Sequence, residues 1–295
     1  MFNIFNLMKR KKSKNDDEAS DKIKINKKVK IGLALGGGGT RGIGHIGALM
    51  AFEELGIKFD YIAGTSSGSI IGALYAFGKT PEEIKEIAKG IKKNELTRGS
   101  IPFLKPAKSE RLENTLNKIF GDITVFSELK IPFCAVCTNL KTGKEVDFDY
   151  GNLSKVLSAS CAVPAIFTPV VYEGMHLVDG GLRNNVPADI VKKMGANVVF
   201  AVDVNHLRGK GTDSLSTISI LSQTIGIIMQ SKIDQTMEDA ELIFKPALET
   251  FSPLKFEYID EMIKIGYDTV MANKSKIQKM LGLSPKKIDA YFTKE

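Results

Sequence analysis

Two apolar segments of this chain run directly into glycine-rich turns, and each turn is followed by a stretch with helical spacing. Residues 29–35 are mostly apolar and end at four consecutive glycines, and residues 61–63 end at a second turn that contains Gly64 and Gly68. A buried strand that enters a helix through a short turn is the repeating unit of a parallel sheet covered by helices. The pattern therefore predicts an α/β fold with a mainly parallel central sheet.

The same alternation continues along the chain and suggests its division into parts. Strands are predicted over residues 131–140, 144–151, 175–178, 196–204 and 240–246, and helices over residues 43–56, 69–78, 110–120, 152–164, 187–195 and 256–281. We expect a basic, disordered tail over residues 1–28, a catalytic core over residues 29–205, and a helical C-terminal extension over residues 206–295 that packs on the core.

The tail carries most of the charge. Residues 1–30 hold 10 basic and 4 acidic side chains, which accounts for nearly all of the net charge of +7. A nucleic-acid-binding fold carries its basic residues on the domain itself, so a nucleic-acid partner is not expected. Apolar residues precede the lysines, the reverse of the order in a secretory signal, which favours a cytoplasmic protein. Two interpretations remain open: a solubilising tail, or peripheral contact of residues 1–14 with the anionic inner face of a membrane.

The second turn matches the G-x-S-x-G pattern of a nucleophile elbow, with Ser66 between Gly64 and Gly68. In such a turn a strand bends sharply into a helix, and the central residue exposes its hydroxyl in a strained backbone conformation. The flanking glycines relieve the crowding, and the helix N-terminus favours the negative charge that develops during acyl transfer. The pattern predicts Ser66 as a nucleophile. The alternative is that Ser66 or Ser67 caps the helix.

The first turn, residues 36–39, is unusual because four consecutive glycines are costly in chain entropy. One interpretation is a dinucleotide-binding loop, since residues 37–42 fit G-x-G-x-x-G. That loop requires an acidic residue at the end of the second strand, but Asp60 lies before that strand. A phosphate-binding Walker loop is also disfavoured, because no Gly-Lys-Ser/Thr follows.

The other interpretation makes the first turn an oxyanion hole. The N–H groups of Gly37, Gly38 and Gly39 would bind the oxyanion of an acyl-transfer intermediate, and Arg41 would add a nearby cation and help to fix the loop. This interpretation uses both glycine motifs together, and we therefore favour it.

A serine nucleophile needs a base. The chain has three histidines, His45, His176 and His206, and each fits a surface or packing position better than a catalytic one. The alternative is a carboxylate. Asp179 follows a short strand and is flanked by Gly180 and Gly181, which is typical of a turn or of a group presented at a site. Partial burial would make it a stronger base.

Together these residues resemble the patatin-like phospholipase family. Members of that family show a G-G-G-x-R/K-G loop, a G-x-S-x-G elbow and a D-G-G/A aspartate, which correspond in order to residues 37–42, 64–68 and 179–181. The Ser-, Ala- and Pro-containing block at residues 158–164 and the segment 184–187 continue the resemblance. Four ordered motifs are far more specific than any one of them.

The resemblance implies a three-layer α/β/α fold and hydrolysis of lipid or lysophospholipid esters through a Ser66–Asp179 dyad, without a metal or other cofactor. It assigns Ser66 as nucleophile, Asp179 as base and the glycines of the first turn as oxyanion donors. Two other functions remain open: a non-catalytic lipid- or nucleotide-binding module, and a histidine-dependent esterase of the α/β-hydrolase type. Cys134 and Cys137 form a C-x-x-C pair, but no second pair completes a metal site, so we expect them to pack in a strand.

Overall fold

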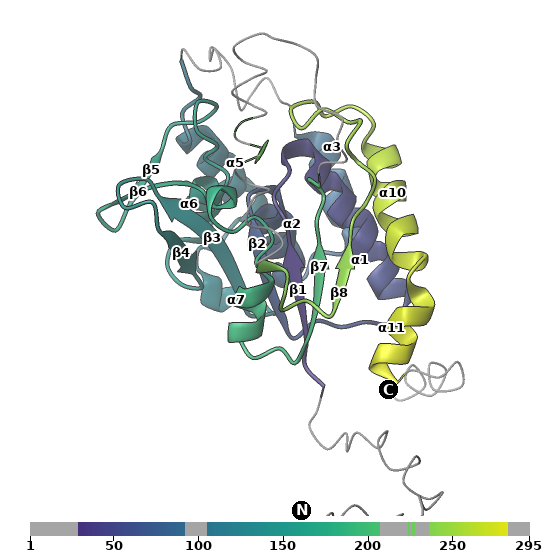
Figure 1. Ribbon diagram of the computed structural model, residues 1–295. Coiled ribbons are helices and arrows are strands. Elements are labelled where there is room, and N and C mark those ends of the chain that lie inside the picture. Colours follow the sequence, from purple (N-terminus) through teal and green to yellow (C-terminus); the bar gives the residue numbers. More distant parts are fainter. Residues whose placement is uncertain (1–28, 92–104, 207–223, 225, 228–235, 283–295) are drawn as a thin grey trace, which may run out of the picture.

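The computed structural model describes residues 29–91, 105–206, 224, 226–227 and 236–282, which form a layered α/β structure (Figure 1). Its strands are β1 (Ile31–Leu35), β2 (Tyr61–Thr65), β3 (Phe133–Asn139), β4 (Glu145–Phe148), β5 (Val170–Tyr172), β6 (Met175–Asp179), β7 (Val198–Val202) and β8 (Leu242–Phe244). Its helices are α1 (Gly44–Glu54), α2 (Ser67–Phe77), α3 (Pro81–Gly90), α5 (Glu110–Phe120), α6 (Leu153–Ser160), α7 (Ala188–Lys193), α10 (Ile259–Met271) and α11 (Lys274–Leu281). Short 3-10 helices are η1 (Gly39–Ile43), η2 (Phe126–Glu128) and η3 (Gly180–Leu182).

The strands form one sheet in the order β5-β6-β3-β2-β1-β7-β8, with β4 also paired to β3. The centre is parallel: β1 pairs with β2 and β7, β2 with β3, and β7 with β8. Beyond the centre, β4 and β6 run antiparallel to β3, and β5 runs antiparallel to β6. The predicted α/β class with a mainly parallel sheet is confirmed, and the turns that follow β1, β2 and β7 meet at one edge of the sheet.

Helices cover both faces of the sheet, as a three-layer fold requires. Alternate residues of β1 point to opposite faces, so Leu33 and Leu35 join one apolar cluster while Ala34 joins another. Large side chains fill the first cluster, which α1, α2 and α6 cover. Ala188, Ile190 and other small or branched residues fill the second cluster, where α7 packs. Outside the first layer, α10 lies alongside α1 (Figure 1).

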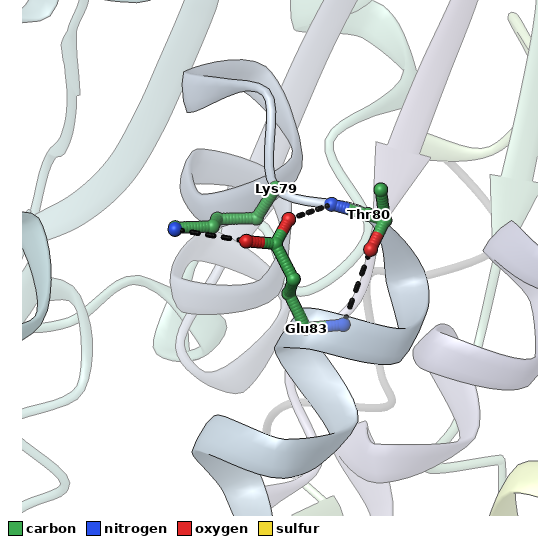
Figure 2. A network of polar contacts seen from close by, with 3 residues as sticks. All are labelled: Lys79, Thr80 and Glu83. Carbon is green, nitrogen blue, oxygen red and sulfur yellow. Dashed lines mark hydrogen bonds and ion pairs between the residues drawn. The ribbon is translucent and has the colours of Figure 1, made fainter.

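Helix α3 is not among the predicted elements, although its start is encoded locally. Thr80 Oγ1 accepts a hydrogen bond from Glu83 N at 3.2 Å, and Glu83 Oε2 accepts one from Thr80 N at 2.9 Å (Figure 2). Lys79 Nζ donates to Glu83 Oε1 at 3.1 Å. This reciprocal cap satisfies two N–H groups that a helix start leaves unpaired. Thr-x-x-Glu followed by an apolar stripe is therefore a sufficient signal for this helix.

The C-terminal region differs from its prediction in one respect. The single helix predicted over residues 256–281 is wrong, because the structure contains two helices, α10 and α11, with a break at Ala272 and Asn273. Asn273 Nδ2 donates to Thr269 O at 2.9 Å, and a side chain that bonds to its own preceding turn competes with helix continuation. The strand predicted over residues 240–246 is confirmed as β8, so this region extends the central sheet as well as adding helices.

None of the helices in the described ranges is both long and apolar enough to cross a membrane. The predicted tail over residues 1–28 and most of the helical segment predicted after His206 lie outside the described residues.

Candidate active site

Ser66 occupies the turn between β2 and α2. Its backbone angles are φ 52° and ψ −126°, and positive φ costs a residue with a side chain about 1–3 kcal/mol. The flanking glycines make the turn sterically feasible, since a Cβ on Gly64 would lie 2.5 Å from Gly68 O, and a Cβ on Gly68 would lie 2.2 Å from Leu35 O. The strained turn places Ser66 at the N-terminus of α2, where the helix dipole favours negative charge.

A second serine holds this strained turn. Ser66 N donates to Ser160 Oγ at 2.9 Å, and Ser160 Oγ donates to Val136 O at 2.6 Å. Ser160 is fully buried at the end of α6, so the hydroxyl joins the turn, β3 and α6 away from solvent. Ser160 belongs to the block that carries the family resemblance, but its sequence context does not reveal this role.

We therefore expect Ser160→Ala to destabilise the chain by about 1–3 kcal/mol, because it leaves the buried Ser66 N without the acceptor that the serine hydroxyl provides. Hydrolytic activity should fall with it, because the turn that presents Ser66 loses its support. Urea unfolding measures the first effect. The matched control is Ser158→Ala in the same helix, whose Oγ donates to Lys155 O at 2.8 Å. An equal cost in both variants would contradict a special role for Ser160.

Asp179 reaches Ser66 because the two residues flank β3. Thr65 pairs with Val136 of β3. Cys137, the next residue of β3, pairs with Asp179 at the end of β6. Neighbouring strands lie about 4.8 Å apart, so side chains on the two sides of one strand can meet across it. The Ser66 hydroxyl interacts with the Asp179 carboxylate and lowers the pKa of that group.

The Asp179 carboxylate is fully buried and only partly satisfied. Its Oδ1 accepts from Gly181 N at 2.8 Å, whereas no described residue bonds to its Oδ2 with hydrogen-bond geometry. Burial raises the pKa of Asp179 to about 6, and the Ser66 hydroxyl and the Gly181 N–H oppose part of that rise. A carboxylate with this pKa is a stronger base than an exposed one. The free oxygen suits a bond to the serine that tightens when substrate binds, as is common in catalytic sites.

Gly37 lies beside Ser66, so the first turn is next to the elbow, as an oxyanion hole in that turn would require. A Cβ on Gly37 would lie 3.0 Å from Ser66 Cβ and 2.7 Å from Asn185 Oδ1. Gly37 N already donates to Asn185 O at 3.1 Å, and Asn185 Nδ2 donates to Gly37 O at 3.2 Å. Glycine is therefore needed at this position because Ser66 and Asn185 leave no room for a side chain. The oxyanion-donor role expected for Gly37 is not favoured, because its N–H is already used by Asn185 O.

The next two amides are less committed to other acceptors. Gly38 N donates to Ser67 Oγ at 3.1 Å, and a hydroxyl can rotate away when a stronger acceptor arrives. Among the described residues, none accepts a hydrogen bond from Gly39 N. Gly38 and Gly39 are thus the two glycines of the loop whose N–H groups can turn to a new acceptor.

Arg41 points away from this position. Its Nε donates to Phe251 O at 2.8 Å, its Nη1 to Asn205 Oδ1 at 2.8 Å and its Nη2 to Glu249 O at 3.1 Å. Because each of the three guanidinium nitrogens donates one of these bonds, the geometry favours the loop-fixing role expected for Arg41 over a direct contact with the oxyanion.

The turn after Asp179 links the separate motifs. A Cβ on Gly180 would lie 2.2 Å from Val136 O, so the turn packs directly on β3. Thr65 Oγ1 donates to Asn184 O at 2.8 Å, which ties the residue before the nucleophile to the aspartate turn. With Asn185 bound to the first turn, residues 184–185 connect all three motifs. The sequence places these asparagines in the family resemblance but gives them no role.

Two of the three histidines occupy the packing and surface positions expected for them. His45 is fully buried in α1, and its Nε2 lies 2.7 Å from Gly36 O. Burial lowers the pKa of His45 to about 4, so the imidazole is neutral and supports the glycine loop as a donor. His176 is exposed on β6. The geometry therefore favours Asp179 as the partner of Ser66.

The cysteines are buried and protonated. Cys134 and Cys137 belong to apolar clusters on opposite faces of the sheet, which confirms the packing role predicted for them. Cys161 interacts with the hydroxyls of Ser66 and Ser69, and burial raises the pKa of its thiol. A protonated thiol is a weak nucleophile, so Cys161 does not compete with Ser66. No group of three or more His, Cys, Asp or Glu side chains in the described part of the chain is arranged to hold a metal ion.

A small apolar pocket lies one helical turn beyond the nucleophile. Ile70 N donates to Ser66 O at 3.3 Å, and the Ile70 side chain lines the pocket. The other lining residues come from α2, from α3 and its C-terminal end, and from α5: Ile71, Leu74, Ile84, Ile87, Ala88, Ile91, Leu112, Thr115, Leu116 and Ile119. The pocket has a volume of about 40 Å³. Ligand pockets are usually at least about 300 Å³, so this one does not hold an alkyl chain in this form.

Comparisons with known sequences place this site in a family. Residues 33–192 match a family model described as patatin-like phospholipase. The chain is 31% identical over 271 residues to a protein named lysophospholipase nte1 from Aspergillus fumigatus, with 80% of this chain and 18% of that protein covered. It is 32% identical over 190 residues to an uncharacterized NTE family protein from Mycobacterium tuberculosis, with 63% of this chain and 52% of that protein covered. The chain thus spans about half of the mycobacterial relative and less than a fifth of the fungal one.

Among solved structures, the fold is similar to that of VipD from Legionella pneumophila, with a TM-score of 0.59, 14% sequence identity, and coverage of 84% of this chain and 67% of that chain. At this identity the likeness concerns the fold alone. The family model covers more than half of the chain and includes both Ser66 and Asp179. The resemblance inferred from the motifs is confirmed: this chain belongs to the patatin-like phospholipase family.

Proposed function

We propose that this chain is a serine hydrolase that cleaves carboxylic esters of lipids, with Ser66 as nucleophile and Asp179 as general base. The observation that carries the proposal is the contact between a strained serine at a helix N-terminus and a buried carboxylate of raised pKa. Membership of the family and relatives named as lysophospholipases support lipid as the substrate class.

In the first half-reaction, Asp179 accepts the Ser66 proton while Ser66 Oγ attacks the ester carbonyl carbon. The carbonyl oxygen takes the negative charge, and we assign the N–H groups of Gly38 and Gly39 as its donors. Gly38 N exchanges the Ser67 hydroxyl for the oxyanion. Each such donor contributes about 3 kcal/mol to the transition state. The carbon–oxygen bond to the alcohol then breaks, and the alcohol leaves with the proton held by Asp179.

In the second half-reaction, Asp179 removes a proton from water, and the resulting hydroxide attacks the acyl group on Ser66. The bond to Ser66 Oγ breaks, the serine recovers its proton from Asp179, and the fatty acid is released. The same carboxylate thus moves a proton twice in each cycle, which requires its pKa to lie near the working pH.

Contact of residues 1–14 with an anionic membrane at its inner face belongs to the same proposal, since lipid esters are presented at such a surface.

The proposal is tested with the purified chain, a fluorophosphonate probe, and esters that include a p-nitrophenyl ester, a lysophospholipid and a diacyl phospholipid. We expect the probe to label Ser66, identified by mass spectrometry, and at least one lipid ester to be hydrolysed. Absence of both labelling and turnover, combined with a rise of the melting temperature on addition of a nucleotide, would instead support a binding module.

The pH dependence of kcat/KM should follow the ionisation of Asp179. A general base must be deprotonated, and burial raises the pKa of Asp179 to about 6, so activity should be low at pH 4–5, rise through about pH 6 and stay level above pH 7. Hydrolysis of a p-nitrophenyl ester with a pH-independent detection step measures the profile. His176→Gln and His206→Gln should leave the rise in place. Loss of the rise in either variant would assign the base to that histidine.

A further inference from the structure

A short segment outside the family-matched residues 33–192 packs against the glycine loop. This segment, residues 249–253, lies within the connection between β8 and α10 and is called the strap below. Arg41 donates to two of its carbonyls, Phe251 O at 2.8 Å and Glu249 O at 3.1 Å. The loop and the strap are separated by about two hundred residues in sequence, yet the Arg41 side chain of the loop hydrogen-bonds to the strap twice.

Thr40 and Gly39 complete this contact. Thr40 Oγ1 donates to Ser252 O at 2.7 Å, and Thr40 N donates to Pro253 O at 3.0 Å. Gly39 has φ +60°, and a Cβ there would lie 2.2 Å from Pro253 O. Every acceptor on the strap is a main-chain carbonyl, so the backbone path of the strap, and not its side chains, sets the position of the loop.

The strap is itself held by packing on either side. Leu248, just before it, is fully buried, and the half-buried Phe251 ring packs against the exposed Tyr258 ring with 6.0 Å between ring centroids. Beyond the strap, α10 and α1 are in backbone contact, since a Cβ on Gly266 would lie 1.9 Å from Gly44 O. The strap therefore joins the glycine loop to a rigid pair of helices.

The buried position of Arg41 requires an arginine side chain. It is 9% exposed, and burial lowers the pKa of Arg41. A buried cation is costly unless it is well hydrogen-bonded, and here the third guanidinium nitrogen donates to Asn205 Oδ1 at 2.8 Å. The planar fork satisfies three acceptors at fixed angles, which a lysine ammonium at the end of a flexible stem does not reproduce.

The contact also fixes the direction of a catalytic amide. Arg41 N donates to Gly38 O at 3.2 Å, so the position of Arg41 sets the orientation of the Gly38–Gly39 peptide plane. In a trans peptide the N–H points opposite to the C=O. Holding Gly38 O toward Arg41 therefore aims Gly39 N away from it.

We propose that the strap is a positioning element of the active site, and that Arg41 and Thr40 act through it to hold the Gly38 and Gly39 amides where the oxyanion forms. This inference rests on the proposed function, because it assigns the strap to the same reaction. It gives residues 249–253 a part in positioning the oxyanion donors.

The test uses Thr40→Val and Arg41→Lys in the full chain. Thr40→Val keeps the shape and loses one bond to Ser252 O, and Arg41→Lys keeps the charge and loses the fork. We expect kcat to fall by about 10-fold and about 10²-fold respectively, with KM within about 3-fold, because amide misplacement of 1 Å or less costs this much. The affinity of a trifluoromethyl ketone, which forms a tetrahedral oxyanion on the serine, should weaken by the same factors.

The control is Thr269→Val in α10, where Oγ1 also donates to a carbonyl, that of Ile265 in the same helix, at 2.7 Å. None of the hydrogen bonds of the described residues joins the Thr269 side chain to the glycine loop. This variant should leave kcat and ketone affinity unchanged. The strap proposal is overturned if Thr40→Val and Arg41→Lys keep wild-type kcat, or if ketone affinity does not follow kcat. Amide hydrogen exchange of residues 36–43 should be faster in both variants than in the wild type, and this measurement tests the strap without relying on activity. If the wild-type chain neither hydrolyses esters nor reacts with fluorophosphonate, the proposed function fails, but the exchange result still decides the strap proposal.

Discussion

Replacement of Ser66 by alanine is expected to lower kcat for ester hydrolysis by at least about 10⁴-fold while the chain stays folded. The nucleophilic oxygen is lost, and the neighbouring Cys161 thiol cannot replace it because burial raises its pKa and keeps it protonated. Alanine retains the backbone N–H that donates to Ser160 Oγ, so the support of the turn survives. Labelling by a fluorophosphonate should disappear together with turnover.

Activity, labelling and urea unfolding are measured side by side for Ser66→Ala and for a control, Ser154→Ala, which changes a buried serine of α6. The control should be labelled at the wild-type rate. Residual turnover of a few per cent in Ser66→Ala, with label on another residue, would remove Ser66 from its assigned role and with it the acyl-enzyme mechanism.

The order of strands and helices near Ser66 could be predicted because its signals are local. An apolar run, a glycine turn and a helical repeat each lie within about fifteen residues, and the elbow at Ser66 needs only Gly64 and Gly68 to be feasible. The break at Asn273 was missed because the apolar stripe of α10 continues past it into α11. Apolar periodicity shows which face of a segment is buried. The Asn273 side chain, which bonds to Thr269 O, ends the helix without changing the spacing of the apolar residues.

The two central residues of the proposed site stand out in the sequence through their motifs, but the residues that support them do not. Ser160 and Asn185 act through bonds to residues that are remote in sequence, Ser66 and Gly37. Such bonds depend on strand register and on how loops pack, which no short pattern encodes. Arg41 shows the same limit, because its cationic character suggests an anion, whereas its partners are carbonyls of a distant segment.

Replacement of Asp179 by asparagine should remove most activity, by about 10²- to 10⁴-fold in kcat, because the proton of Ser66 loses its acceptor. The shape of the site should change little, since the asparagine oxygen can still accept from Gly181 N. The rise of activity near pH 6 should vanish together with the activity.

The same variant should be more stable than the wild type at pH 8. Burial raises the pKa of Asp179 from 3.8 to about 6, so the folded state binds a proton more tightly than the unfolded state does. The wild type therefore loses stability as pH rises through about 4 to 6, by roughly 1–3 kcal/mol once the carboxylate is charged. Asparagine is neutral at every pH and avoids that loss.

Urea unfolding of wild type and Asp179→Asn at pH 8 and at pH 4 separates these effects. The variant should gain stability over the wild type at pH 8 and should show little or no gain at pH 4, where Asp179 is protonated in the folded state. Asp122→Asn, at an exposed position after α5, should show no such pH-dependent gain. A site that stabilises transition states is expected to be locally destabilising, because its buried charge is matched to substrate and not to the empty fold. If Asp179→Asn were instead less stable at pH 8, the carboxylate would be a structural partner of the turn, and the base would have to be sought elsewhere.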